Sequence, residues 1–353
     1  MTMNPVPPVR RADAARLSRR SLLGTAAAGL AGLPLRARAD GHAPTAAPAS
    51  THPRPAMQGA GFYTKAVGDL TVTLLSDGTF LFPTGLHPVI GGDAGADAVH
   101  AALADRFVPR NGVLAHVNTL LIQTPDGKNL LVDAGCGKAF GGETTNQLVT
   151  HLANIGLAPA DIDAILVTHA HPDHIGGLLG DDGSLRFPEA QIVLSETERG
   201  FVRDPDFSRS RLDAGTIAVF TALSQKVFSL IGDDKLTLVN DGDEVLPGSG
   251  VTVMAAPGHT PGHLLCHLAS GGDRLLYMSD ILHFPPVQLA HPDWKVAFDA
   301  DTAVAGKTRR KMLDLAAADG VAVASSHLAF PAFGHLKTRG QGYAFVPELW
   351  SWS

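Results

Sequence analysis

Cysteine is scarce in this chain. Its 353 residues include only 2 cysteines, Cys136 and Cys266, but 16 histidines. This balance argues against metal sites built from thiolates and favours sites built from imidazole and carboxylate groups. The two cysteines can pair in only one way, but pairing requires a geometry that a sequence does not display. We expect two buried free thiols rather than a disulfide.

Long basic runs and serine-nucleophile motifs are also missing. The formal net charge is −6, and no long Lys/Arg run follows residue 40, so nucleic-acid binding has no electrostatic support. No Gly-x-Ser-x-Gly motif is present to place a catalytic serine. The composition is otherwise that of an ordinary globular protein, with 45% hydrophobic and 18% charged residues. A small-molecule substrate is the expected partner.

The one long apolar run close to the N-terminus has the features of an export signal. Arg19 and Arg20 precede the run at 21–33, and a small-residue motif at 37–39 follows it. This order is typical of a signal peptide, and the paired arginines resemble a twin-arginine signal. The run is too short for a membrane span, so we expect no stable anchor after cleavage and a periplasmic or secreted protein. The predicted organisation is a twin-arginine-type signal peptide at 1–39, a flexible leader at 40–60 and a catalytic domain at 61–353.

Strand and helix patterns come in alternating clusters after residue 61. Short apolar strands are predicted at 70–75, 117–123, 129–132, 162–167, 191–194, 236–239, 251–255, 264–268, 275–278 and 321–324. Helices are predicted at 94–107, 144–155, 220–230 and 302–318. This pattern favours an α/β fold, an αββα sandwich of two mixed β-sheets with outer helices.

The motif His169-Ala170-His171-Pro172-Asp173-His174 is the strongest chemical signal. It begins where an apolar strand ends. Alternate residues of an extended segment point the same way, so His169 and His171 can face one metal ion. The turn at Pro172 would direct Asp173 and His174 toward a neighbouring position. Three histidines and an aspartate within six residues predict a metal site.

Further candidate ligands also follow apolar strands. His259 lies after the strand at 251–255, Asp280 after 275–278 and His327 after 321–324. Strand ends that meet at one rim are where α/β folds place their sites.

These elements, in this order, resemble the metal motifs of the metallo-β-lactamase superfamily. The stretches at 61–63, 74–79, 326–336 and 342–347 are similar to the methyl parathion hydrolase-like and lactonase-like group within it. The resemblance implies a binuclear site in which Asp280 bridges two metal ions. The first ion would be held by His169, His171 and His259, and the second by Asp173, His174 and His327.

The resemblance also implies the cofactor and the reaction. Imidazole and carboxylate ligands suit two zinc ions per chain, with Mn, Co or Fe as alternatives. Two adjacent ions activate water for attack on a carbonyl carbon or a phosphorus atom. We expect an exported hydrolase of lactones or esters, possessing phosphotriester hydrolysis as a side or main activity. A β-lactamase and a mono-iron oxidoreductase resembling persulfide dioxygenase are the alternatives.

Asp133 and His283 are candidates for supporting roles. Asp133 matches the family's first motif, in which a carboxylate orients a ligand histidine; the alternative is a turn aspartate. His283 lies three residues after Asp280, where acyl-homoserine lactonases of this superfamily carry a tyrosine. A histidine there would donate a hydrogen bond to a developing oxyanion, or else face water in a loop.

Other residues bear on the pocket and the surface. Phe140 matches a pocket phenylalanine of the methyl parathion hydrolase group, with a plain core position as the alternative. That group carries a tryptophan near Val202, and its absence here favours lactones over aryl phosphotriesters. His263, His267 and His335 are expected outside the metal site. Trp350 and Trp352 are expected to cover an apolar edge, or a partner surface if the chain forms a homodimer.

Overall fold

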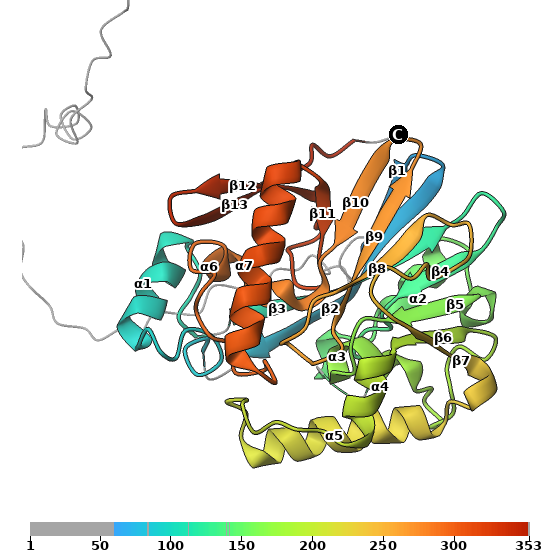
Figure 1. Cartoon of the computed structure of the whole chain (residues 1–353), viewed down its shortest axis with the longest axis horizontal. Helices are drawn as coiled ribbons and strands as arrows, with labels where there is room; N and C mark the ends of the chain where they lie inside the picture. Colours follow the sequence, from blue (N-terminus) through green and yellow to red (C-terminus); the bar gives the residue numbers. More distant parts are fainter. Residues whose placement is uncertain (1–59, 83–84, 112, 139, 141, 352–353) are drawn as a thin grey trace, which may run out of the picture. The chain divides into compact units, whose positions relative to one another are not determined.

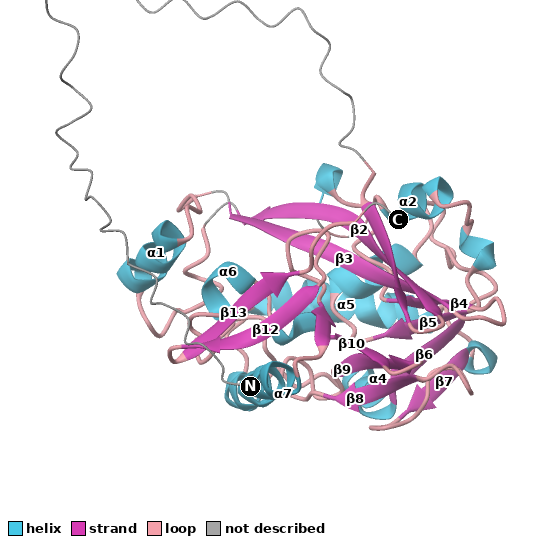
Figure 2. Cartoon of the chain, turned by 90° about the horizontal axis from the view of Figure 1, so that it is seen from above, coloured by secondary structure: helices cyan, strands magenta, loops and turns pink. Residues whose placement is uncertain are grey.

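Two β-sheets pack face to face, with helices on their outer sides (Figures 1 and 2). The computed structural model describes residues 60–351 except 83–84, 112, 139 and 141. The predicted signal peptide at 1–39 and all but the last residue of the predicted leader lie outside the described residues. None of the described helices combines the length and apolarity needed to cross a bilayer.

The first sheet has seven strands in chain order. Neighbouring strands are antiparallel from β1 to β4 and parallel from β4 to β7. The strands are β1 (Phe62–Val67), β2 (Leu70–Phe82), β3 (Val113–Gln123), β4 (Asn129–Val132), β5 (Ala164–Val167), β6 (Gln191–Ser195) and β7 (Leu236–Val239). The apolar parallel strands end at the same edge, where the histidine motif follows β5.

The second sheet has six strands in the order β13-β12-β11-β10-β9-β8. Its only parallel pair among the described strands is β10 with β11. The strands are β8 (Val251–Ala255), β9 (Leu264–Ser270), β10 (Asp273–Tyr277), β11 (Ala322–Ala324), β12 (Gly334–Arg339) and β13 (Gly342–Pro347). Because β10 and β11 run in parallel, the loops that follow them emerge side by side.

Helices complete the αββα sandwich, which confirms the predicted fold class. They are α1 (Ala96–Asp105), α2 (Leu148–Asn154), α3 (Pro172–Ile175), α4 (Glu196–Arg203), α5 (Ala214–Ser229), α6 (Pro285–Gln288) and α7 (Thr302–Asp319). The longest, α7, is capped by Asp301, whose carboxylate accepts from Ala303 N–H and Val304 N–H at 3.0 Å. It ends at Gly320, whose φ of 59° is easily adopted by glycine.

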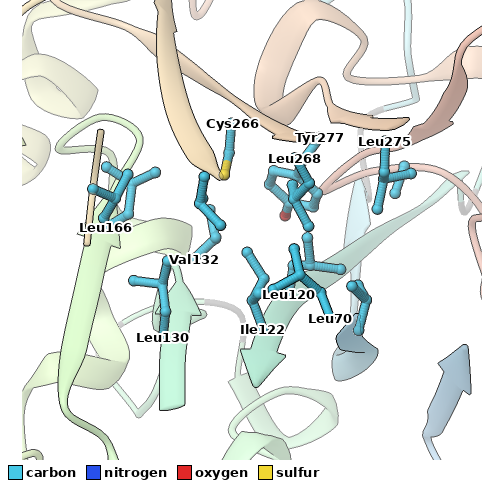
Figure 3. Close-up of a cluster of buried hydrophobic side chains, with 14 of the residues drawn as sticks. Leu70, Leu120, Ile122, Leu130, Val132, Leu166, Cys266, Leu268, Leu275 and Tyr277 are labelled. Atoms are coloured by element: carbon cyan, nitrogen blue, oxygen red, sulfur yellow. The ribbon is translucent and has the colours of Figure 1, made fainter. Parts of the chain in front are cut away.

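The inner faces of the two sheets form the central core (Figure 3). Leu120, Ile122 and Val132 of the first sheet face Cys266 and Leu268 of the second, and all are buried. Separate buried clusters lie beneath α2 and α5 on the first sheet and beneath α7 on the second. Each sheet is thus apolar on both faces, so its strands read as short continuous apolar runs in the sequence.

Three elements differ most from the sequence prediction, while smaller shifts occur at element ends, as where β3 begins at Val113 instead of 117 and α2 at Leu148 instead of 144. The strand expected to end at Leu75 continues to Phe82, because a bulge between Ser76 and Gly78 keeps β2 paired with β3. The helix expected at 220–230 begins earlier, at Ala214, where the Asp213 side chain accepts from Thr216 N–H at 3.0 Å. The hairpin β12–β13 was not predicted, because the second half of β12 is polar and exposed and gives no apolar strand signal.

Candidate metal centre

The histidine-rich motif lies at the carboxyl end of β5. His169 and His171 follow this strand, and His171 has extended backbone angles of φ −76° and ψ 155°. Pro172 then begins α3, whose first turn carries Asp173 and His174. The change from extended to helical backbone turns the last two side chains away from the first two. All three histidines are buried.

Loops of the second sheet bring three more candidate ligands to the same place. His259 follows β8, Asp280 lies in a 3-10 turn (Ser279–Ile281) after β10, and His327 follows β11. Each side chain is at most 5% exposed. Ligands from both sheets therefore meet at one rim of the sandwich.

The seven candidate ligands form two groups. His169, His171 and His259, here called the A cluster, offer ligand atoms within 4.8 Å of one another. Asp173, His174, Asp280 and His327, here called the B cluster, meet the same limit. These groups contain the residues that the sequence assigned to the first and second ions.

Asp280 of the B cluster also faces the histidines of the A cluster. Its Oδ2 is 3.4 Å from Nε2 of His259 and 3.9 Å from Nε2 of His169 in the A cluster. The same oxygen is 3.1 Å from Nε2 of His327, and Oδ1 is 3.2 Å from Nε2 of His174. One carboxylate therefore reaches both clusters, as a bridging ligand must.

The hydrogen bonds of His169 and His259 favour a cation between their rings. Nε2 of His169 and Nε2 of His259 lie 3.0 Å apart. The Nδ1 of His259 faces Asp299 Oδ1 at 3.0 Å, so it carries the proton. The hydroxyl proton of Thr168 goes to Asp133, so Nδ1 of His169 donates to Thr168 Oγ1 at 3.1 Å. Both Nε2 atoms consequently present lone pairs to each other, which is unfavourable unless a cation lies between them.

Burial reinforces this preference for a metal ion. Burial lowers the pKa of His169 and of His259 well below the usual histidine value, so both rings are neutral ligands. In the B cluster, Nε2 of His174 and Oδ1 of Asp280 lie 3.2 Å apart but not in hydrogen-bond geometry, and neither atom has another hydrogen-bond partner among the described residues. Buried polar atoms of this kind need a partner, and a divalent metal ion fits this donor set.

Buried carboxylates contact the Nδ1 atoms of two candidate ligand histidines and orient their rings. Asp133 Oδ2 is 2.8 Å from Nδ1 of His174, and Asp133 Oδ1 accepts from Thr168 N–H at 2.8 Å. Burial lowers the pKa of His174, but the carboxylates of Asp280 and Asp133 outweigh it and raise that pKa well above normal. Asp133 thus lies where the sequence placed an orienting carboxylate rather than in an isolated turn.

Asp299 plays the same part for His259 in the A cluster. Its Oδ2 accepts from the buried Arg309 guanidinium at 3.1 Å, while Oδ1 faces His259. Arg309 also donates to the carbonyl of Ile281, next to Asp280, at 2.9 Å. Burial raises the pKa of Asp299 to about 6, although the Arg309 charge opposes this. The pair fixes the His259 ring and the Asp280 turn together.

An apolar pocket opens onto the two clusters. Five phenylalanines line it together with His171, Asp173, His259, Asp280, His283 and His327. The five rings contact one another in a closed series, with centroid distances of 5.2 to 6.4 Å: Phe80–Phe82, Phe82–Phe298, Phe298–Phe220, Phe220–Phe140 and Phe140–Phe80. The clusters therefore lie at the base of an aromatic enclosure suited to an apolar substrate group.

The sequence profile of the metallo-β-lactamase superfamily matches residues 112–327, a range that contains both clusters. The chain belongs to this superfamily. With its His/Asp clusters, it is a metal-dependent hydrolase of the metallo-β-lactamase fold that binds divalent metal at this rim.

Solved structures of other superfamily members share this fold. AidC, a dizinc quorum-quenching lactonase, is 30% identical with a TM-score of 0.76, over 82% of this chain and 98% of AidC. The hydrolase AbOPH is 29% identical with a TM-score of 0.74, over 84% of this chain and 100% of AbOPH. A curated relative, exodeoxyribonuclease WalJ of Streptococcus pneumoniae, is 41% identical over 61 residues, which span only 20% of its length.

Phe140 and His283 both line the pocket of this metallo-β-lactamase-fold hydrolase. His283 is only 6% exposed, which rules out a loop histidine facing water. Its Nε2 lies 3.5 Å from Asp280 Oδ2, and its Nδ1 is buried without a partner among the described residues. The backbone N–H of His283 donates to Gln288 Oε1 at 2.6 Å, which fixes the loop.

Several residues of this centre were not predicted. Phe80 and Phe82 come from β2, Phe220 from α5 and Phe298 from the loop before α7, and only the fold brings these three segments together. The same holds for the pair Asp299 and Arg309. Their sequence signal is weak, since an isolated acidic residue before a helix usually reads as a cap.

The remaining histidines and the cysteines lie where the sequence placed them. His263 accepts from Asp280 N–H at 3.4 Å through Nε2, so it touches a ligand's backbone but joins neither cluster. His267 lies on β9, and Nδ1 of His335 contacts the Gly320 carbonyl at 3.0 Å. Cys136 and Cys266 are buried free thiols, as predicted.

Proposed function

We propose that this chain is an exported binuclear hydrolase that opens lactones, and that it belongs to the methyl parathion hydrolase-like and lactonase-like group. The observation that carries the proposal is the pair of clusters beneath an apolar pocket, in a chain that is similar to a dizinc lactonase over 98% of that protein. Two zinc ions per chain are the proposed cofactor, with Mn, Co or Fe as alternatives.

The residues of the chain divide the work of the reaction. When bound, the two ions supply an activated water and polarise the substrate carbonyl. Asp280 holds both clusters at a fixed separation, and Asp133 and Asp299 keep His174 and His259 in the correct orientation. The phenylalanine enclosure binds the apolar part of the substrate and excludes bulk water.

His283 is the proposed donor to the reacting carbonyl. It lines the pocket beside Asp280 and His259, and the unpartnered Nδ1 leaves it a free polar atom. A tetrahedral oxyanion forms when a carbonyl is attacked, and a nearby donor stabilises that charge. This arrangement supports a lactone or ester substrate.

Phosphotriester hydrolysis is the second candidate activity, because an aromatic pocket also suits an aryl leaving group. Val202 lines a smaller cavity that shares His171 and Phe220 with the main pocket. No tryptophan occupies this position to stack on an aryl ring, which supports lactones as the better substrates.

A hydrolysis panel on metal-analysed protein tests the proposal. The substrates are lactones of differing acyl length, aryl esters, aryl phosphotriesters and β-lactams. We expect about two zinc-like ions per chain and the highest kcat/KM on lactones. A single bound iron, or a higher kcat/KM on β-lactams or phosphotriesters, would contradict the lactonase assignment.

A further inference from the structure

Glu198 is a buried carboxylate with no part in the reaction described above. It lies on α4 and is 0% exposed. Its Oε1 accepts from the N–H of Ala170 at 2.9 Å. Its Oε2 accepts from the hydroxyl of Thr260 at 2.6 Å and the N–H of Gly262 at 3.1 Å. Three donors therefore share one carboxylate.

These donors belong to the two loops that build the A cluster. Ala170 lies between His169 and His171, after β5 of the first sheet. Thr260 is next to His259, after β8 of the second sheet. A Cβ atom at Gly262 would lie 2.2 Å from Glu198 N, so the loop packs directly on α4. Glu198 thus joins the two halves of the A cluster across the sandwich.

Asn118 has the matching position at the B cluster. It lies on β3 of the first sheet and is 1% exposed. Its Nδ2 lies within 3.3 Å of three carbonyl oxygens in the loop around His327, those of Ser325, Ser326 and Leu328. The hydroxyl of Tyr277 donates to the Asn118 carbonyl at 2.8 Å from the second sheet. One side chain again joins a ligand loop to the opposite sheet.

We propose that Glu198 and Asn118 are positioning residues, one for each cluster, which set the two metal affinities independently. The proposal rests on the two-ion site proposed above. A metal centre requires its ligand atoms to be held at fixed separations, and residues that orient ligands typically change affinity by about 10- to 100-fold. Because the two side chains contact different ligand loops, each should affect mainly its own ion.

Stepwise zinc binding to the metal-free full chain tests this inference. Competition with a chromophoric chelator gives two dissociation constants, and crystals grown with one equivalent of zinc show by anomalous scattering which cluster fills first. We expect Glu198→Gln to weaken zinc binding at the A cluster about 10- to 100-fold and to change zinc binding at the B cluster less than about threefold. Asn118→Ala should give the reverse.

Milder variants cover the case in which a buried substitution prevents folding. Thr260→Val removes one donor to Glu198, and Tyr277→Phe removes one contact to Asn118. Thr260→Val should weaken zinc binding at the A cluster, and Tyr277→Phe should weaken it at the B cluster, each by a smaller factor. Glu196→Gln, at an exposed position of the same helix, is the matched control and should leave both constants unchanged.

The possible outcomes separate the two proposals. Wild-type protein that binds only one ion contradicts the two-ion site itself. Two ions with unchanged constants in the folded variants overturn the positioning role. Equal weakening of both ions, with a lower melting temperature, also overturns it, because that result reports a general loss of structure.

Discussion

Asp280 is the residue on which both clusters depend most directly. Its two oxygens lie within 3.1 to 3.9 Å of four ligand histidines. Replacement by Asn keeps the shape but removes the negative charge and one anionic oxygen. Asp280→Asn should therefore lose at least one metal ion and at least about 100-fold in turnover. Metal analysis and lactone kinetics measure both, and full metal content with normal turnover would refute the bridging role.

His283 is the residue that separates the candidate substrates. A donor to the oxyanion typically contributes about 10²- to 10³-fold in kcat, so His283→Leu should lower lactone turnover by that factor. A bulkier phosphotriester gains room, and its hydrolysis should be unchanged or faster. The measurement is kcat/KM for one aryl lactone and one aryl phosphotriester, with metal content checked. Equal loss on both substrates would indicate a supporting role instead.

Single residues differ in how far the sequence reveals them. The ligand motif was recognisable because metal chemistry demands particular residue types at short spacings. Glu198 was not, because it lies in the charged run Glu196-Thr197-Glu198-Arg199, which resembles an exposed helix face. Its burial depends on loops from both sheets that only the folded chain brings to α4.

Among the elements, the bulged strand β2 connects the sheet to the pocket. Asp77, at the bulge, is buried and accepts from the N–H groups of Cys136, Asn146 and Leu148. These residues belong to the segment that carries Phe140, so Asp77 supports one wall of the pocket. The strand was expected to end at Leu75 because Ser-Asp-Gly, which follows it, usually marks a turn. Pairing with β3 overrides that local preference.

Asp77 also gives this element a pH dependence. Burial raises its pKa from 3.8 to about 6, although the N–H donors oppose this, so the folded protein holds a proton that the unfolded chain releases. The contribution of protonated Asp77 to the free energy of unfolding is present below about pH 4 and is lost as pH rises through 6. The stability advantage of wild type over Asp77→Asn should therefore shrink by up to about 3 kcal/mol between pH 4 and 7. Urea denaturation of the metal-free proteins measures it, and a constant difference would contradict the raised pKa.

At the scale of the whole molecule, the proposed export signal precedes the catalytic domain. A twin-arginine route requires both Arg19 and Arg20. Replacing both with Lys should leave unprocessed protein in the cytoplasm, as fractionation and the mass of the product would reveal. The same double substitution at the start of the predicted signal peptide, Arg10→Lys with Arg11→Lys, is the control for charge-neutral change away from the paired arginines. Mature double variant in the periplasm would rule out this route.

Because the candidate ligands come from both sheets, each ion of the proposed two-ion site would cross-link the two halves of the sandwich. His169 and His259 of the A cluster come from opposite sheets, and so do His174 and His327 of the B cluster. Metal present at 100 times its dissociation constant adds about 2.7 kcal/mol of stability per ion. A chelator should therefore lower the melting temperature by roughly 10 °C, measured by calorimetry, and zinc should restore it. If chelation leaves the melting temperature unchanged, the sheets hold together without the ions. If the melting temperature falls, chains that have not acquired metal unfold before the metal-loaded enzyme does.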